Sequence, residues 1–393
     1  MRLPIYLDHN ATTPVDPRVF EAMMPFFCET FGNAASRGHS FGWAAEAAVD
    51  KARQQAAAII NANPNAIVWT SGSTEANNLA IKGVACAYKH KGRHIITQAT
   101  EHKAVLDPCK RLAADGYDVT VLGVDRRGRI DMDEFAASLR PDTILVSIMW
   151  ANNEIGTIAP IRKIGQLCRS KGICFHTDAT QAVAKIPIDV EADCIDLLSF
   201  SAHKMYGPKG SGALYVRHKP ERIELACQLD GGGHERGYRS GTLNVPGIVG
   251  LGMACEIGMQ QQPIDAPRLR VLRDKLEAGI RSRVDGVHVN GDPDNRLSHM
   301  TNLCFEGVPG DSMLGALEDI AVSSGSACTS ASLEPSYVLR ACGVDRCLAF
   351  SSLRFSLGRS TTEEEIDYAI EQTTSCITNL RALAAMTTGA MVK

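Results

Sequence analysis

The sequence lacks the features that mark several broad classes of protein. No two of its 13 cysteines have Cys-x-x-Cys spacing, which argues against zinc ribbons and thioredoxin-type redox sites. No apolar run reaches the ~20 residues that a membrane-spanning helix requires. The formal charge is only −3 and the pI is about 6.4. We therefore expect neither nucleic acid nor a membrane as a partner.

Two nucleotide-binding patterns are absent as well. The sequence has no Walker A motif and no Gly-x-Gly-x-x-Gly run, so a bound nucleotide is not indicated. Residues 1–6 contain neither an apolar signal-peptide core nor a transit segment rich in Arg and Ser, and we expect a cytoplasmic protein. In a reducing cytosol most of the cysteines are expected to be small buried apolar side chains.

The pattern that is present is an alternation of apolar runs and helical segments. It predicts βαβ units and a mostly parallel sheet. The expected strands are 67–71, 94–100, 119–124, 143–150, 173–177, 196–201 and 212–216. The expected helices in and before this region are 17–26, 42–60, 75–88, 103–114, 131–139 and 160–171.

After about residue 255 the pattern changes. A helix is expected over 266–282 and leads to the segment 287–291, after which strands are expected at 300–305 and 353–356. The last helix is expected to begin with a capping box in Thr361-Thr362-Glu363-Glu364. The whole chain is thus predicted to be an α/β protein with a mostly parallel central sheet flanked by helices and a smaller α+β domain. We place the large domain at 14–255 and the small domain at 1–13 and 256–393.

The segment from Ile195 to Gly210 is the centre of the functional prediction. A buried strand is expected to end on Ser201-Ala202-His203-Lys204, and ligands bind at such strand ends in open α/β sheets. A lysine held out of bulk water has a lowered pKa, and its neutral amine can form a Schiff base with an aldehyde. The alternative is a lysine that merely extends from a loop into solvent. Polar groups also follow three other strands, at 100–102, 151–154 and 178–181, which favours a site at this edge.

An anion site is indicated where the strand from Ile67 meets the next helix. The turn Ser71-Gly72-Ser73-Thr74 precedes helix-forming residues, and a helix N-terminus with free N–H groups and hydroxyls binds a compact phosphate. The alternative is ordinary helix capping by Ser73 or Thr74. Residues 231–242, with three consecutive glycines and two arginines, are expected to form an anion-binding or subunit-contact loop, or otherwise a solvated turn.

One thiol is predicted to differ from the others. Cys328 lies in a stretch of small residues, 322–332, that has no apolar period and no charge. Such a stretch is expected to be a loop that presents the thiol, although an ordinary loop cysteine would fit the same pattern. A thiol of this kind requires a pKa below its usual ~8.5 to be mostly thiolate at neutral pH.

A Schiff-base lysine that acts on amines needs an electron-accepting cofactor. Pyridoxal phosphate requires a lysine for its aldehyde, a carboxylate for its pyridine nitrogen, a phosphate cup and a partner for the ring face. The sequence offers candidates for all four functions, namely Lys204, Asp178, a phosphate set of Ser73, Thr74, Ser201 and His203, and His102.

These stretches resemble the cysteine desulfurases of the NifS/IscS type, within the class-V aminotransferases and fold-type I pyridoxal-phosphate enzymes. The resemblance covers the chain to about residue 385. It is carried by Tyr-Leu-Asp-His-Asn-Ala-Thr-Thr-Pro at 6–14, Thr-Ser-Gly-Ser-Thr-Glu at 70–75, Thr-Glu-His-Lys-Ala-Val at 100–105, Ala-Asn-Asn-Glu-Ile-Gly at 151–156, His-Thr-Asp-Ala-Thr-Gln at 176–181, Ser-Ala-His-Lys at 201–204, Gly-Gly-Gly-His-Glu-Arg-Gly at 231–237, Arg-Ser-Gly-Thr at 239–242, Ser-Ser-Gly-Ser-Ala-Cys-Thr-Ser at 323–330 and Arg-Phe-Ser-Leu-Gly-Arg at 354–359.

The resemblance implies roles toward the cofactor, pyridoxal 5'-phosphate. Lys204 would bond to its aldehyde and move the substrate Cα proton, and Asp178 would keep the pyridine nitrogen protonated. Gln181 would bond the ring hydroxyl oxygen, and His102 would stack on the ring and serve in proton transfer. The remaining cofactor-binding residues implied are Ser73 through its backbone amide, Thr74, Asn153, Ser201, His203 and, across a homodimer, Thr242.

The resemblance also implies the substrate and the path of its sulfur. Asn153 and Arg354 would hold L-cysteine, Arg354 by a bidentate clamp on the carboxylate. Cys328 would take the substrate sulfur as a persulfide, L-alanine would leave, and the Cys328 loop would carry the sulfur to acceptor or scaffold proteins for iron–sulfur clusters or other sulfur cofactors. The one metal role left open is transient iron–sulfur ligation by Cys328.

Three alternatives remain at this point. The chain could be a selenocysteine lyase, a pyridoxal-phosphate aminotransferase, or a sulfur-relay protein without catalysis, and the combination of Lys204, Asp178 and His102 argues against the last. The acceptor also stays open, whether for nitrogenase, housekeeping clusters or tRNA thiolation. Scaffold-binding members carry a longer C-terminal extension with an aromatic anchor, so docking by that route is a further open point.

Overall fold

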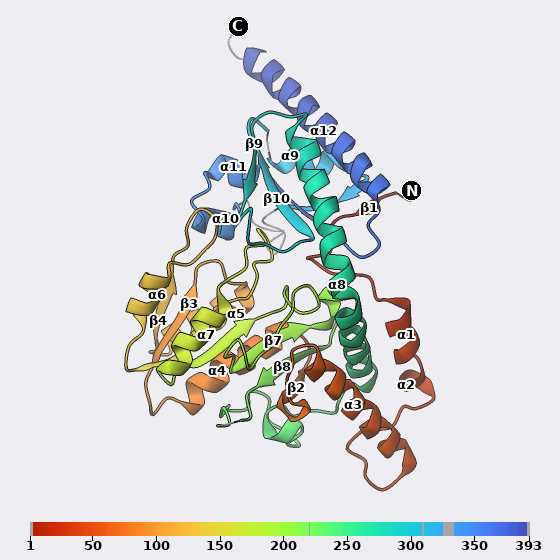
Figure 1. The fold of residues 1–393 in the computed structure, drawn as a ribbon, viewed down its shortest axis with the longest axis vertical. Coiled ribbons are helices and arrows are strands. Elements are labelled where there is room, and N and C mark those ends of the chain that lie inside the picture. The colour runs from red at the N-terminus through yellow and green to blue at the C-terminus, as the bar shows by residue number, and fades with distance from the viewer. Residues whose placement is uncertain (1–2, 220, 309, 325–333, 391–393) are drawn as a thin grey trace.

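The computed structural model describes residues 3–219, 221–308, 310–324 and 334–390 (Figure 1). Cys328 and most of its predicted loop lie outside these ranges. Within them, no helix combines the length and the hydrophobicity that a bilayer span requires.

A seven-stranded sheet forms the centre of the larger part of the molecule. Its strands run side by side in the order β2-β8-β7-β6-β5-β3-β4, and β8 is antiparallel to both of its neighbours while the other pairs are parallel. The mostly parallel sheet predicted from the sequence is therefore confirmed. The strands are β2 (Ile67–Thr70), β3 (His94–Gln98), β4 (Asp118–Leu122), β5 (Thr143–Ser147), β6 (Cys174–Asp178), β7 (Leu197–Ser201) and β8 (Gly212–Val216).

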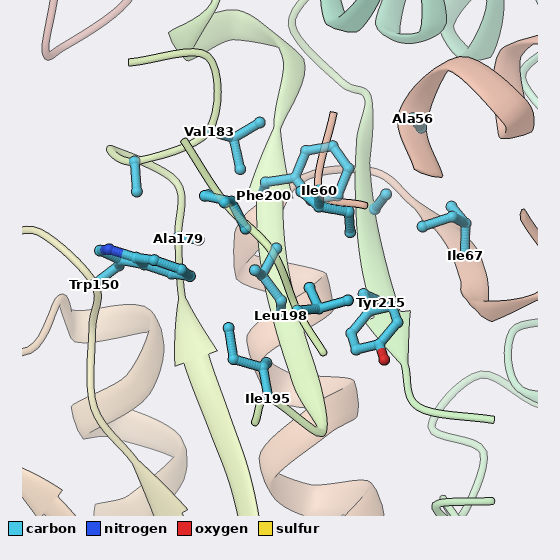
Figure 2. Packing of buried hydrophobic residues seen from close by; sticks show 14 of the residues in the cluster. Ala56, Ile60, Ile67, Trp150, Ala179, Val183, Ile195, Leu198, Phe200 and Tyr215 are labelled. Atoms are coloured by element: carbon cyan, nitrogen blue, oxygen red, sulfur yellow. The ribbon is translucent and has the colours of Figure 1, made fainter. Parts of the chain in front are cut away.

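Helices cover both faces of this sheet (Figure 1). One apolar cluster joins the sheet to α3 (Ser40–Ala58), α6 (Met132–Ser138), α7 (Ile161–Ser170) and the first part of α8 (Val245–Arg281). A second cluster joins the other face to α4 (Ser73–Ala87) and α5 (Lys103–Ala114). Strand β7 shows why both faces are apolar, since Leu198 and Phe200 point into the first cluster and Leu197 into the second. Figure 2 shows Leu198 and Phe200 among the side chains of the first cluster, which also contains Trp150 and Ala179.

The smaller part contains a four-stranded antiparallel sheet in the order β12-β13-β10-β9 and a two-stranded parallel pair, β1-β11. Ile5 and Leu7 from the N-terminal segment pack in the same apolar cluster as Ile366 and Ile370 of the last helix. The division at residues 13/14 and 255/256 stays a prediction. The elements are β1 (Ile5–Tyr6), β9 (Val287–Asn290), β10 (Met300–Phe305), α9 (Gly310–Ala316), β11 (Ile320–Ala321), β12 (Ser323–Ser324), α10 (Tyr337–Ala341), α11 (Arg346–Phe350), β13 (Ser352–Ser356) and α12 (Glu363–Ala390).

Helix boundaries differ from the sequence predictions at the prolines. A separate helix over 266–282 was expected, but α8 is continuous from Val245 to Arg281 through Pro263 and Pro267. Its first part packs in the large apolar cluster and its last part in the small one, and this packing outweighs the backbone hydrogen bonds that the prolines remove. The helix expected over 17–26 is instead divided into α1 (Pro17–Met23) and α2 (Pro25–Cys28).

The capping box of α12 is present one residue further along than the stretch that predicted it. The backbone N–H of Thr362 donates to Glu365 Oε2 at 2.9 Å, and the N–H of Glu365 donates to Thr362 Oγ1 at 3.2 Å. These reciprocal bonds satisfy two backbone donors at the start of the helix.

Candidate active site

A cavity of about 300 Å³ lies where the parallel strands of the large sheet end. Nine of the residues singled out from the sequence line it, namely Ser73, Thr74, His102, Asn153, Asp178, Gln181, His203, Lys204 and Arg354. Asp178 is the last residue of β6, and Lys204 ends a short 3₁₀ turn, Ala202–Lys204, directly after β7. Because β6 and β7 are neighbouring parallel strands, their carboxyl ends bring these two side chains to one wall.

Lys204 is held at the wall by the N-terminal segment of the chain. Its Nζ donates to the backbone oxygen of Asn10 at 2.7 Å and to that of Ala11 at 2.5 Å. Asn10 is itself fixed, because its Oδ1 lies 2.7 Å from Nε2 of His299 and its N–H donates to Ser356 Oγ at 2.9 Å. The amine is thus a donor at a defined position on the cavity surface.

Asp178 is oriented by two hydrogen bonds. Its Oδ2 accepts from Nδ2 of Asn77 at 2.7 Å, and its Oδ1 accepts from the N–H of Thr180 at 3.0 Å. Asp178 is only 5% exposed, so these bonds fix a carboxylate inside the protein rather than at its surface. A buried carboxylate with one oxygen bound on each side can hold a cationic ring nitrogen in one orientation.

The N-terminus of α4 provides the anion-binding corner of the cavity. Gly72 precedes this helix and has no side chain to cap it, while Ser73 and Thr74 in its first turn line the cavity. Gly212 on β8 lies so close that a Cβ there would be 2.5 Å from Gly72 Cα, so only glycine lets the turn pack on the strand. Ser201 lies behind this corner, where its Oγ donates to Ser211 O at 3.3 Å.

The two histidines of the cavity are neutral at neutral pH. Burial, followed by the charges of Lys204, Lys209 and Lys185, lowers the pKa of His203 to about 4. Burial is also the main cause that lowers the pKa of His102. The Nδ1 of His102 accepts from the N–H of Ala104 at 3.1 Å, so in the neutral ring the proton is on Nε2. His102 therefore offers a flat neutral ring with one fixed tautomer.

Arg354 has both a partner that the sequence did not suggest and a free donor. Its Nη2 donates to Asp8 Oδ1 at 2.7 Å and its Nη1 to the backbone oxygen of Asn153 at 3.0 Å. Among the described residues, the buried Nε of Arg354 and the buried Oδ1 of Asn153 have no hydrogen-bond partner. Both residues line the cavity, and an amino acid has carboxylate and ammonium groups that pair with a guanidinium and an amide oxygen.

Two of the predicted site residues do not line this cavity and one cannot be placed. Ser201 is buried behind the anion-binding corner, and Thr242 is exposed outside the cavity. Cys328 lies outside the described residues. Within the described ranges, no group of three or more His, Cys, Asp or Glu side chains could hold a metal ion.

Two hydrogen-bond partners of the predicted site residues were not identified from the sequence, although both lie in or next to the motifs quoted above. Asp8 is the third residue of the stretch at 6–14, and Asn77 lies two residues beyond the stretch at 70–75. A buried arginine and a buried aspartate each require a partner, and this requirement is the signal that could have identified them.

The donor set fits pyridoxal phosphate. The cavity joins an amine, an oriented carboxylate, an uncapped helix N-terminus and a neutral imidazole, which are the four protein groups that this cofactor needs. Fold and site thus define a pyridoxal-phosphate-dependent enzyme of the aminotransferase type. The class-V aminotransferase family matches residues 5–369, and the chain belongs to this family.

Similar proteins narrow the class further. The chain is 59% identical over 388 residues to cysteine desulfurase IscS of Pectobacterium carotovorum subsp. carotovorum (strain PC1), covering 98% of this chain and 96% of that protein. It is 55% identical over 386 residues to cysteine desulfurase IscS of Anaeromyxobacter sp. (strain K), covering 98% and 95%. Within its family the chain is therefore a cysteine desulfurase of the NifS/IscS type that uses pyridoxal phosphate.

Solved structures agree with this assignment. A NifS-like protein, 38% identical, superposes with a TM-score of 0.89 and covers 97% of this chain and 100% of its own. The structure of SspA in complex with cysteine, also 38% identical, has a TM-score of 0.80 and covers 90% of this chain and 98% of its own.

Proposed function

We propose that this chain converts L-cysteine to L-alanine in the cavity described above and delivers the sulfur through Cys328. The observation that carries the proposal is the meeting of Lys204, Asp178 and the uncapped start of α4 in one cavity that Arg354 also lines. Pyridoxal phosphate, when bound, accepts the electron pair that is released at the substrate Cα.

Each cavity residue has a distinct task in this proposal. Lys204 carries the cofactor and afterwards moves a proton at the substrate Cα. Asp178 holds the pyridine nitrogen in its protonated form, and Gln181 donates to the ring oxygen. His102 covers the ring face and serves in proton transfer. Ser73, Thr74 and His203 hold the phosphate, the first through its backbone amide at the helix N-terminus. Ser201, buried behind them, joins them by turning its hydroxyl away from Ser211.

The substrate is held by its α-carboxylate. The Arg354 guanidinium donates to this group, and because Asp8 and the Asn153 backbone already fix the guanidinium, little side-chain entropy is lost on binding. Asn153 also lines the cavity, and its side-chain amide binds the amino-acid end of the substrate or the cofactor.

The sulfur step needs no outside oxidant or reductant. The Cys328 thiolate attacks the substrate sulfur, the bond between that sulfur and the substrate Cβ breaks, and an S–S bond forms. The carbon that loses sulfur gains a proton and becomes the methyl group of alanine, while the transferred sulfur stays on Cys328 as a persulfide. That persulfide is then passed to a sulfur-acceptor or scaffold protein.

The functional unit is a homodimer in this proposal. Thr242 is exposed outside the cavity of its own chain, so its predicted phosphate contact belongs to a second copy's site. The region of α1, α2 and the start of α3 carries exposed aromatic rings, and exposed apolar surface of this kind is typical of subunit contacts. These rings belong to Phe20, Phe27, Phe31, Phe41 and Trp43. We place the dimer in the cytoplasm.

The test is product analysis with L-cysteine and a dithiol reductant, which releases the persulfide sulfur as sulfide. We expect alanine and sulfide in equal amounts and a yellow protein. In Cys328→Ala the cofactor should still bind but sulfide should fall to background. Retained transfer of the amino group in this variant would indicate an aminotransferase, and pyruvate in place of alanine would contradict the proposal.

A further inference from the structure

A second lysine lies behind the cavity and has no task in the reaction as described. Lys185 borders a small chamber of about 40 Å³ that shares Lys204 with the active-site cavity. This chamber has room for about two water molecules. The titratable side chains around it are His9, Lys204, Tyr206, Asp265, His299 and Arg359.

The amine of Lys185 is bound to one side chain of the active site. Its Nζ donates to Oε1 of Gln181 at 2.5 Å. Gln181 in turn donates from Nε2 to the backbone oxygen of Asn10 at 3.0 Å, the same oxygen that accepts from Lys204 at 2.7 Å. Lys185, Gln181, Asn10 and Lys204 thus form one chain of hydrogen bonds that passes from the small chamber to the active-site cavity.

These contacts leave only one orientation for the Gln181 carboxamide. An amine donates and a backbone carbonyl accepts, so the carboxamide oxygen faces Lys185 and the nitrogen faces Asn10. The amide nitrogen carries two hydrogens, and Asn10 takes one of them. Gln181 is 4% exposed and lines the active-site cavity, so the second hydrogen is available to a ligand there.

We propose that Lys185 is a positioning residue that fixes Gln181 as a hydrogen-bond donor toward a negatively charged oxygen of the cofactor ring. Without Lys185, only the bond from Nε2 to the Asn10 oxygen would orient the Gln181 carboxamide, and an oxygen turned toward the cavity would repel the ring oxygen. The inference rests on the proposed function, because it assumes pyridoxal phosphate in this cavity.

The electrostatic surroundings disfavour the charged form of Lys185. Burial, and then the charges of Lys204 and Arg354, lower the pKa of Lys185 well below its usual value. An amine donates to Gln181 Oε1 whether or not it is protonated, so the geometry of this contact does not depend on the charge of Lys185.

The test is a pH titration of the visible absorbance of the holoenzyme. Lys185→Met keeps the length of the side chain and removes the hydrogen-bond donor. Losing a donor to the ring oxygen should make the cofactor hold its titrating proton more tightly. The midpoint should therefore rise by about 0.5 to 1 pH unit, the size expected for one hydrogen bond to a titrating group.

Two further variants separate positioning from a general effect on the structure. In a double-mutant cycle, the single variant Gln181→Ala should by itself raise the midpoint of the pH titration. Adding Lys185→Met to Gln181→Ala should then shift this midpoint no further. Lys185→Gln, whose amide can still donate to Gln181, should restore most of the wild-type midpoint and serves if Lys185→Met does not fold. The exposed Lys171→Met is the matched control and should titrate as wild type.

An unchanged midpoint in Lys185→Met, or shifts that add in the double mutant, would overturn the inference. A wild-type protein that takes up no pyridoxal phosphate would instead refute the proposed function, and the inference would fall with it. The two failures are distinguishable because the first is read in a coloured wild-type holoenzyme and the second in its absence.

Discussion

Asp8 and Arg354 form an ion pair with 2.7 Å between Oδ1 of Asp8 and Nη2 of Arg354. The second carboxylate oxygen of Asp8 accepts from Ser323 Oγ at 2.9 Å. Asp8 thus joins the arginine at the cavity wall to β12, which precedes residues 325–333 and Cys328 in the sequence. Arg354, for which we propose substrate binding, and the strand before Cys328, the proposed sulfur acceptor, thus share one carboxylate.

Replacing Asp8 by Ala should destabilise the protein. The side chain of Arg354 is 5% exposed and that of Asp8 17%, so the change leaves an arginine charge largely buried without its partner. We expect the free energy of unfolding, measured in urea, to fall by about 1–3 kcal/mol. Ser323→Ala removes one hydrogen bond from the same carboxylate and should cost less than Asp8→Ala. Equal losses of unfolding free energy in the two variants would show that the ion pair between Asp8 and Arg354 adds nothing to stability.

Arg354→Lys should weaken substrate binding while leaving the fold intact. Lysine keeps a positive charge for Asp8 but lacks the planar fork that reaches a carboxylate with a second N–H. We expect KM for L-cysteine to rise by about tenfold or more, the effect of losing one charge-assisted hydrogen bond. The control is Arg162→Lys, an exposed arginine paired with Asp193. A KM that does not change in Arg354→Lys would remove Arg354 from the substrate site.

Asn77→Ala should weaken the binding of pyridoxal phosphate. The Nδ2 of Asn77 holds Asp178 at 2.7 Å, and Asp178 without this bond loses its fixed orientation. We expect the dissociation constant of the cofactor, measured by equilibrium titration of the apoprotein, to rise by about tenfold. A matched control is Asn61→Gly, which removes an exposed contact between an asparagine and Asp189 and tolerates the positive φ of 52° at that position. Equal affinity in Asn77→Ala and wild type would contradict this role.

His9 should make the protein less stable in weak acid. Burial lowers the pKa of His9 to about 4, and the ring donates from Nδ1 to Ser356 O at 3.1 Å. Between pH ~6.5 and ~4 the unfolded chain binds a proton that the folded chain does not, so stability falls as the pH falls through this window. One such group contributes up to about 3 kcal/mol.

The measurement for His9 is urea unfolding at pH 7.5 and pH 5. His9→Gln keeps a donor for Ser356 and cannot titrate, so its loss of stability between the two pH values should be smaller than that of wild type. It should not vanish, because burial also lowers the pKa of His176 and of His203 to about 4. The same loss of stability between pH 7.5 and pH 5 in His9→Gln and in wild type would show that His9 does not contribute to the acid sensitivity.

The sequence predicted the sheet and most of the cavity because both follow from local patterns. Apolar runs of five residues and the polar groups after them are visible in the chain, and parallel strands bring such groups to one edge without further information. Asp178, Lys204 and the start of α4 were found in this way.

What the sequence did not predict depends on contacts between distant segments. The pairing of Asp8 with Arg354 joins residues 346 positions apart, and the bond from Lys204 to Asn10 spans 194. The continuous course of α8 through Pro263 and Pro267 likewise depends on packing against two separate cores, which overrides the local effect of proline. No local pattern carries this information.

The central claim is that Lys204 is the residue that carries the cofactor. Borohydride treatment of the holoenzyme, followed by proteolysis and mass spectrometry of the peptides, fixes the cofactor on the lysine that bears it. The account predicts a single pyridoxyl group on the peptide that contains Lys204 and none in Lys204→Ala. A label on Lys185, the other lysine that borders the small chamber, would contradict it.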